Sequence, residues 1–314
     1  MQLFKNTIIN FHGIKDEKWL ENVFNLLLRR YTVIPIAEIE SYYYQKKTLN
    51  NVCHITFDDG EKNFYEKVFP LLIKYQIPVS LYVSPFAIQT GKNFWFQEIR
   101  GYDQKLYRQI VSKKFYIDKI KNFEKIPLKL LLKSLTLESI WDTIDEYRSL
   151  TNTFLKPPIN INVDQLKELH RSGLVEIGAH TQNHPILKNE SDEIAKREIT
   201  ESVKQLGELL NNEIRYFAYP NGDPSFDFGK REIDILKSVG IKLAFSTEAS
   251  GLLNNNNPFA IPRIGFSYGN KSFILSKLVF VNKWEILKSL FGKDVEKQRN
   301  LLIRKVLNDS KNFI

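Results

Sequence analysis

The stretch that decides the fold is residues 52–83, which reads VCHITFDDGEKNFYEKVFPLLIKYQIPVSLYV. Residues 52–57 are apolar and rich in β-branched side chains, so they predict a buried strand. Residues 64–75 follow with helical periodicity, and residues 78–83 predict the next strand. A strand, a helix and a second strand in this order predict a parallel pair joined by a right-handed crossover.

The same alternation continues on both sides of this stretch. Further strands are expected at residues 8–11, 33–36, 175–178, 216–218 and 242–246. Further helices are expected at residues 18–30, 37–45, 163–172, 192–210 and 228–238. Alternating strands and helices predict an α/β fold with a mostly parallel sheet. The periodicity alone does not distinguish a barrel from an open sheet.

Residues 97–156 interrupt the alternation. They are rich in Lys, Leu, Ile and Tyr, contain almost no Gly, and end at Pro157-Pro158. This composition predicts a helical insertion. We therefore expect one domain over residues 1–270 that includes the insertion, and a helical C-terminal extension over residues 271–314.

Composition limits the kinds of site and location that are expected. Cys53 is the single cysteine, which excludes an internal disulfide and a cysteine-based zinc cluster. The first residues have no long apolar segment followed by small residues, and no run of about 18 apolar residues occurs, so neither a signal peptide nor a membrane span is predicted. The expected location is cytoplasmic.

Positive charge is concentrated near the C-terminus. The net charge is +9, and residues 272–314 hold nine Lys and Arg against four Asp and Glu. Lys283 and Lys288 flank Trp284 within an apolar segment, which favours either peripheral contact with an anionic membrane or simple packing on the domain. No nucleic-acid partner is expected.

Acidic and imidazole side chains follow two of the predicted strands. Asp58 and Asp59 end one strand, where adjacent carboxylates repel unless a cation or a hydrogen-bond donor relieves them. His180 and His184 follow another strand at a spacing that lets both rings face one point. Ligand sites in parallel α/β folds lie at such strand ends. One Asp and two His predict a divalent metal site, and the second Asp is a candidate general base.

Three segments resemble the signatures of the polysaccharide deacetylases, carbohydrate esterase family 4. They are TFDDGEKNFYEKVFPLLIKYQIPVSLYVSP at residues 56–85, EIGAHTQNHP at residues 176–185, and RYFAYPNGD at residues 215–223. The later stretches AFST and PFAIPRI are also similar in style to this family. The resemblance covers roughly residues 50–95 and 160–266.

This resemblance implies a distorted (β/α) barrel of about seven strands. It implies Asp59, His180 and His184 as ligands of one divalent metal, with zinc expected and nickel, cobalt or iron as alternatives. It also implies Asp58 as the general base and a backbone N–H near Asn221 as part of an oxyanion site.

Further contacts to the substrate are expected from two aromatic residues. Tyr219 belongs to the third signature, next to the expected oxyanion site. Trp95 is a candidate for a sugar-binding face, because aromatic rings offer large apolar surfaces. Packing within the insertion is the alternative for Trp95 and its neighbours Phe94 and Phe96.

Two departures from the family pattern affect the catalytic residues. The third signature has Ala218 where the family has an Arg that orients the base, and Arg263 is the candidate substitute, with Arg215 as the alternative. The late histidine that supplies the general acid is missing, since no histidine follows His184. His12, in NFHGI, resembles the N-terminal acid histidine of the branch that deacetylates poly-β-1,6-N-acetylglucosamine.

The sequence therefore predicts a metal-dependent N-deacetylase that hydrolyses the N-acetyl amide of an amino sugar in a glycan or glycan precursor. One alternative is a deformylase or another amidase that acts on a related sugar amide. A different alternative is a non-catalytic glycan-binding relative. His54, within a strand, and His170, on a helix, are expected to be structural.

Overall fold

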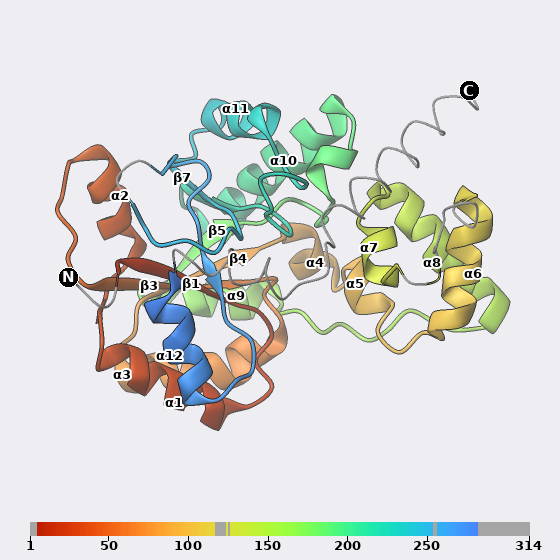
Figure 1. Ribbon diagram of the computed structural model, residues 1–314. Coiled ribbons are helices and arrows are strands. Elements are labelled where there is room, and N and C mark those ends of the chain that lie inside the picture. Colours follow the sequence, from red (N-terminus) through yellow and green to blue (C-terminus); the bar gives the residue numbers. More distant parts are fainter. Residues whose placement is uncertain (1–4, 117–123, 125, 254–255, 282–314) are drawn as a thin grey trace.

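The computed structural model describes residues 5–116, 124, 126–253 and 256–281. One parallel sheet lies at its centre, with helices around it (Figure 1). The strands are β1 (Thr7–Phe11), β2 (Thr32–Val33), β3 (Val52–Asp58), β4 (Val79–Val83), β5 (Val175–Ala179), β6 (Tyr216–Ala218), β7 (Leu243–Phe245) and β8 (Ile264–Gly265). Their order is β7-β6-β5-β4-β3-β1-β8, and β2 pairs with β3. The predicted α/β fold with a parallel sheet is confirmed.

Helices connect the successive strands from β1 to β7. Around the sheet lie α1 (Glu17–Leu28), α2 (Ile36–Tyr44), α3 (Phe69–Tyr75), α4 (Pro85–Thr90), α9 (Val163–Arg171), α10 (Asp192–Leu210), α11 (Lys230–Ser238) and α12 (Lys271–Val279). The insertion contains α5 (Trp95–Glu98), α6 (Gln104–Phe115), α7 (Leu128–Leu132) and α8 (Leu137–Thr151). Figure 1 shows α6, α7 and α8 grouped on one side of the barrel.

Two predicted elements differ from the observed ones because of proline. The helix expected over residues 64–75 begins as a π-helical turn, Phe64–Val68, and continues as α3. Pro70, in the first turn of α3, has no N–H to donate to the preceding turn. The strand expected over residues 33–36 ends at Val33, because Pro35 caps α2.

Alternating strand residues build two separate apolar layers. On β1, β3 and β4, residues such as Ile9, Ile55 and Leu81 belong to the large cluster that packs against the helices. Tyr82 on β4 and Phe245 on β7 belong to a second cluster on the opposite face, inside the barrel. This two-residue period is expected when both faces of a sheet are buried.

The interior of the barrel also contains polar side chains with buried partners. His54 lies between Ile34 and Ser80: its Nδ1 is 2.8 Å from the Ile34 carbonyl oxygen, and its Nε2 is 2.9 Å from the Ser80 hydroxyl. Burial lowers the pKa of His54 to about 4, so the ring is neutral at neutral pH. This agrees with a structural role, and His170 lies on α9 as expected.

A short segment spans the gap between the two ends of the sheet. The Ala244 N–H on β7 donates to the Pro258 carbonyl, and the Ile261 N–H donates to the Ala244 carbonyl. A few residues later, the Phe266 N–H donates to the carbonyl of Asn10 on β1. This segment contains β8, which the sequence did not predict, and it completes the distorted barrel.

The insertion and the start of the expected C-terminal extension pack differently. The insertion has its own apolar core, which includes Trp95, Tyr107 and Leu131. By contrast, Ile274 and Leu278 of α12 belong to the main cluster of the barrel. The predicted membrane-contacting region around Trp284 lies outside the described residues. Across the described part of the chain, no helix has the length and apolar character needed to cross a membrane.

The tight packing of β5 gives a test of this architecture. A Cβ at Gly178 would lie 2.4 Å from Cε1 of Tyr82 and 2.8 Å from the carbonyl oxygen of Tyr216. Gly178→Ala should therefore lower the free energy of unfolding by about 1–3 kcal/mol, as overpacking typically does. Urea unfolding measures this change.

Gly265→Ala on β8 is the matched control, because a Cβ there meets no atom within 4 Å. It should unfold at nearly the same urea concentration as the parent protein. Equal stability of the two variants would contradict the close packing of β5 against its neighbours.

Candidate active site

The predicted site residues meet at the carboxyl ends of the strands. Asp58 ends β3 and Asp59 follows it, while His180 directly follows β5. His12 follows β1, and Asn221 lies in the turn after β6. Together with His184 they line one small pocket of about 90 Å³, whose other lining residues are Trp95, Phe96, Lys129 and Thr247.

The backbone at these positions adopts conformations that are unusual for residues with a side chain. Asp59, Thr181, His184 and Asn221 have positive φ values of 74°, 63°, 59° and 60°. Such conformations cost free energy, and they persist where the surrounding structure holds them. Here they turn Asp59 and His184 toward the same point.

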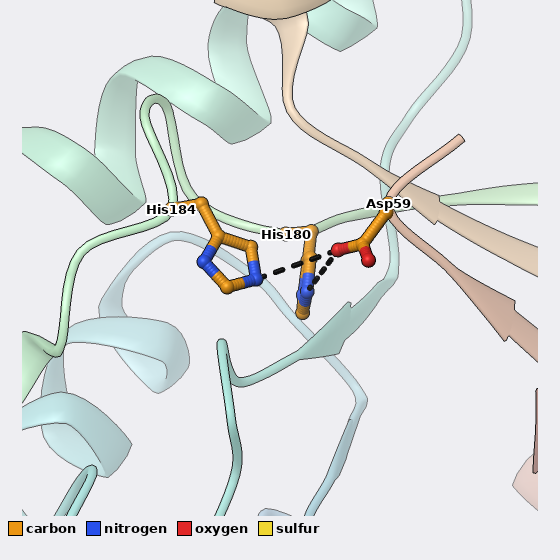
Figure 2. A group of neighbouring side chains, drawn as sticks. All are labelled: Asp59, His180 and His184. Carbon is orange, nitrogen blue, oxygen red and sulfur yellow. Dashed lines mark ion pairs between the residues drawn. The ribbon is translucent and has the colours of Figure 1, made fainter. Parts of the chain in front are cut away.

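Asp59, His180 and His184 form the candidate metal site. Nε2 of His184 is 3.4 Å from Oδ1 of Asp59, and Nε2 of His180 is 3.7 Å from the same oxygen (Figure 2). Oδ1 of Asp59 is buried and has no hydrogen-bond partner among the described residues. A buried carboxylate oxygen without a partner is costly, and a cation between the three ligands would satisfy it. The residues therefore fit a divalent metal.

The protonation of His180 also suits a metal ligand. Its Nδ1 is 2.6 Å from the carbonyl oxygen of Ala218 at the end of β6, which fixes a hydrogen on Nδ1. The Nε2 lone pair then faces the space shared with Asp59, where a cation can accept it. Burial lowers the pKa of His180 to about 4. The ring is therefore neutral at neutral pH, as metal binding requires.

Asp58 has a separate set of partners. Arg263 donates to both carboxylate oxygens, from Nη1 to Oδ1 at 2.8 Å and from Nη2 to Oδ2 at 2.9 Å. Asn10 donates to Oδ2 at 2.9 Å. Burial alone would raise the pKa of Asp58, but the charge of the Arg263 guanidinium holds this pKa below its usual range. Asp58 is thus ionised, oriented and able to accept a proton.

The structure distinguishes between the two candidate arginines. Arg263 is fully buried. In the chain it lies between Ile261, which pairs with Phe245 of β7, and β8, which pairs with β1. Arg215 instead directly precedes β6 and pairs with Glu40 on α2, whereas Asp58 lies at the carboxyl end of β3. Arg263 is therefore the arginine that contacts the candidate base.

His12 lies at the open side of the pocket. Its Nε2 is 3.9 Å from Oδ2 of Asp58, and its side chain is 58% exposed. An exposed imidazole at the mouth can meet a substrate group that enters the pocket. His12 therefore lies where an incoming substrate would pass, and its role as the acid stays a prediction.

The expectation for Tyr219 is corrected. Its side chain is buried, its ring stacks on Phe228 at 3.6 Å, and its hydroxyl donates to the Phe259 carbonyl. It therefore packs in the core and does not line the pocket. Asn221 does line it: its Nδ2 is buried without a partner among the described residues, and its carbonyl accepts from the Thr247 hydroxyl.

The aromatic run at the start of the insertion combines both alternatives that the sequence left open. Trp95 is buried in the core of the insertion and also lines the pocket. The rings of Phe94 and Phe96 pack against the His184 imidazole, with centroids 5.2 and 4.9 Å away. The insertion therefore supports a candidate metal ligand directly.

Two lining residues were not predicted from the sequence. Lys129 comes from α7, in a Leu- and Lys-rich stretch that has no strand end to mark it. Thr247 follows β7 in the stretch AFST, whose family resemblance was the only available signal.

Known proteins resemble this chain in sequence. Residues 122–244 match the family model described as Polysaccharide deacetylase. This match includes His180 and His184, while Asp58 and Asp59 precede it. The Poly-beta-1,6-N-acetyl-D-glucosamine N-deacetylase of Staphylococcus aureus strain MSSA476 is 23% identical over 235 residues, which are 72% of this chain and 58% of that protein. This chain thus spans less than two thirds of the relative's length.

Solved structures resemble it in fold. IcaB from Ammonifex degensii matches with a TM-score of 0.59 and 16% identity, covering 88% of this chain and 97% of that one. The Streptococcus pyogenes deacetylase PplD in complex with acetate matches with a TM-score of 0.57 and 17% identity, covering 87% and 98%. The predicted distorted barrel and the resemblance to polysaccharide deacetylases are confirmed.

The metal ligands give a direct prediction. His184→Ala should abolish both stoichiometric metal binding and activity, because it removes one of three converging ligands. Metal content by inductively coupled plasma mass spectrometry is the measurement. His170→Ala, at a partly exposed position on α9 outside the pocket, should retain the metal. Full metal occupancy in the His184 variant would show that the ligand assignment is wrong.

The pair between Arg263 and Asp58 predicts a pH-dependent loss of stability. Arg263→Met should lower the free energy of unfolding by about 3–5 kcal/mol at neutral pH, because the Asp58 carboxylate stays buried without its partner. In the parent protein the depressed pKa of Asp58 contributes stability above the unfolded value of about 3.9, and this stability is lost as pH falls through the folded value. The difference between parent and variant should therefore shrink in acid.

Urea unfolding over a range of pH values measures this effect. The double variant Asp58→Asn with Arg263→Met removes both charges, so it should regain part of the stability and still lack activity. A single variant that unfolds like the parent at neutral pH would contradict the stabilising role of the pair.

Proposed function

We propose that this chain is a metal-dependent N-deacetylase that hydrolyses the N-acetyl amide of an amino sugar in a glycan. The observation that carries the proposal is the small pocket in which a candidate metal site adjoins an ionised carboxylate held by a buried arginine. The similarity to a Poly-beta-1,6-N-acetyl-D-glucosamine N-deacetylase supports an N-acetylglucosamine polymer as the substrate class.

Two imidazole nitrogens and one carboxylate oxygen suit zinc, and nickel, cobalt and iron accept the same ligands. A divalent cation held by Asp59, His180 and His184 would polarise the amide carbonyl and make a water molecule more acidic. The rest of the reaction depends on the side chains around it.

Asp58 is the general base in this proposal. It accepts a proton as water attacks the acetyl carbon, and its bonds to Arg263 and Asn10 keep the carboxylate oriented for this step. The backbone N–H of Asn221 stabilises the negative charge that develops on the carbonyl oxygen, since the N–H groups of Tyr219, Gly222 and Asp223 donate to other partners.

His12 is the general acid. An amide anion is a very poor leaving group, so the nitrogen must gain a proton as the carbon–nitrogen bond breaks. His12 gives that proton from the exposed side of the pocket, and the products are acetate and a free amino sugar.

Acetate release from N-acetylated sugars tests the proposal. The metal-loaded protein should release acetate from oligomers of β-1,6-linked N-acetylglucosamine. His12→Ala should lower kcat by about 10²–10⁴-fold with unchanged metal content, and it should flatten the alkaline limb of the pH–rate profile, since that limb reports loss of the acid's proton.

His170→Ala serves as the control and should keep the parent rate. Formate release from formamido sugars without acetate release would indicate a deformylase instead. Absence of any acid release from a metal-loaded protein would refute the enzymatic proposal, and a near-normal kcat in the His12 variant would refute only the assignment of the acid.

A further inference from the structure

A second cavity lies directly behind the wall of the catalytic pocket. It has a volume of about 520 Å³ and lies between α8 of the insertion and α4 with the loop that follows it. Phe94 and Asn183 line it. Asn183 is the residue next to His184, and the Phe94 ring packs on the His184 imidazole at 5.2 Å. One aromatic ring therefore separates this cavity from the candidate metal site.

The two spaces differ in what they can hold. The catalytic pocket, at about 90 Å³, accommodates a small group such as an acetamido substituent. The second cavity lies within the range of about 300–1,000 Å³ that is typical of sites for small organic ligands. A glycan whose N-acetyl group enters the pocket must place its neighbouring sugars on adjoining surfaces. This cavity adjoins the pocket, since Asn183 lines the cavity and the next residue, His184, lines the pocket.

The lining of the cavity has the chemistry that sugars require. Trp141 and Phe86, both partly exposed, supply aromatic surface for the apolar faces of pyranose rings, while the buried Phe94 forms the wall toward His184. Arg148 and Asp145 line the same space and form an ion pair at 3.0 Å, so they hold each other in place while offering donors and acceptors to hydroxyl groups.

Buried hydrogen bonds hold the walls in position. Nδ2 of Asn93 donates to the buried carboxylate of Glu98 at 2.8 Å and to the carbonyl of Pro157 at 3.0 Å, which ties the loop after α4 to the end of the insertion. On the other wall, Asn183 donates from its backbone N–H and from Nδ2 to the buried carboxylate of Glu198. The cavity is therefore preformed, which reduces the cost of ordering it on binding.

We propose that this cavity, formed by α8, α4 and the loop that ends at Phe94, is a second sugar subsite. It binds a sugar of the glycan that neighbours the sugar being deacetylated. This inference rests on the proposed function for the identity of the glycan. The helical insertion then selects substrates by length, because a single sugar in the catalytic pocket cannot also fill the subsite.

Filling the cavity tests the proposal without removing core packing. Leu155 lines the cavity and is 45% exposed, so Leu155→Trp adds bulk at its edge. Phe154→Trp introduces the same side chain at the neighbouring position, which is 79% exposed and does not line the cavity. Trp141→Ala is a second variant that removes the main aromatic surface.

Binding is measured by calorimetry with oligomers of one to six β-1,6-linked N-acetylglucosamine residues. All proteins carry Asp58→Asn together with Arg263→Met, which prevents turnover without leaving a buried charge unpaired. Affinity should rise with chain length in the parent and in the Phe154 variant. Leu155→Trp and Trp141→Ala should weaken binding of the hexamer roughly tenfold and leave binding of the monosaccharide unchanged. Acetate release by the same variants with Asp58 and Arg263 restored should lose its dependence on chain length.

The outcomes separate the two proposals. The subsite proposal is wrong if the hexamer does not bind the protein, or if it binds the Leu155→Trp and Phe154→Trp variants with equal affinity. Weaker binding to the Leu155 variant together with no acetate release from any oligomer upholds the subsite as a glycan-binding cavity and refutes the enzymatic function.

Discussion

The buried ion pair between Arg263 and Asp58 is the constraint on which the rest of the structure depends. Both side chains are almost fully excluded from water, so neither charge is tolerable without the other. Arg263 also donates to the Ser246 carbonyl after β7, and its guanidinium lies over the rings of Tyr82 and Phe245 inside the barrel. The segment that carries Arg263 connects β7 to β1. The segment that closes the barrel therefore also orients the candidate base. A change that separates this segment from β7 or β1 would remove Arg263 from Asp58.

Adjacent carboxylates would repel each other if they shared one environment. The left-handed backbone at Asp59 prevents this, because it turns Asp59 toward the two histidines while Asp58 continues the strand toward Arg263. Each carboxylate thus meets a different positive partner: a guanidinium for Asp58, and the candidate cation site for Asp59. The same turn separates their chemistry. The Asp58 carboxylate is held ionised by its hydrogen bonds, whereas Oδ1 of Asp59 lacks a hydrogen-bond partner among the described residues.

The sequence predicted the parts of the site that depend on local pattern. The strands before Asp58 and His180 are marked by apolar β-branched runs, and parallel strands bring their carboxyl ends together, so the meeting of Asp58, Asp59, His180 and His184 followed from spacing and topology. The sequence could not decide between Arg263 and Arg215. Arg263 is 205 residues from Asp58 in the chain, and it meets Asp58 only because its segment closes the barrel between β7 and β1. Tyr219 was misassigned for a similar reason: signature membership does not reveal that a ring stacks on Phe228. Lys129 reaches the pocket only through the tertiary fold of the insertion.

The barrel and the insertion do not act independently. The insertion has its own apolar core, so it can hold its shape as a unit, yet its first residues place Phe94 and Phe96 against the imidazole of His184. His184 makes few other contacts that would orient its ring, since its Nδ1 is buried without a partner among the described residues. Aromatic packing from the insertion therefore takes the place of the hydrogen bond that usually orients a metal-binding histidine. A ligand that moved α8 or the loop ending at Phe94 would shift these rings, and with them the position of His184. The insertion and the strand ends of the barrel are thus linked through one imidazole.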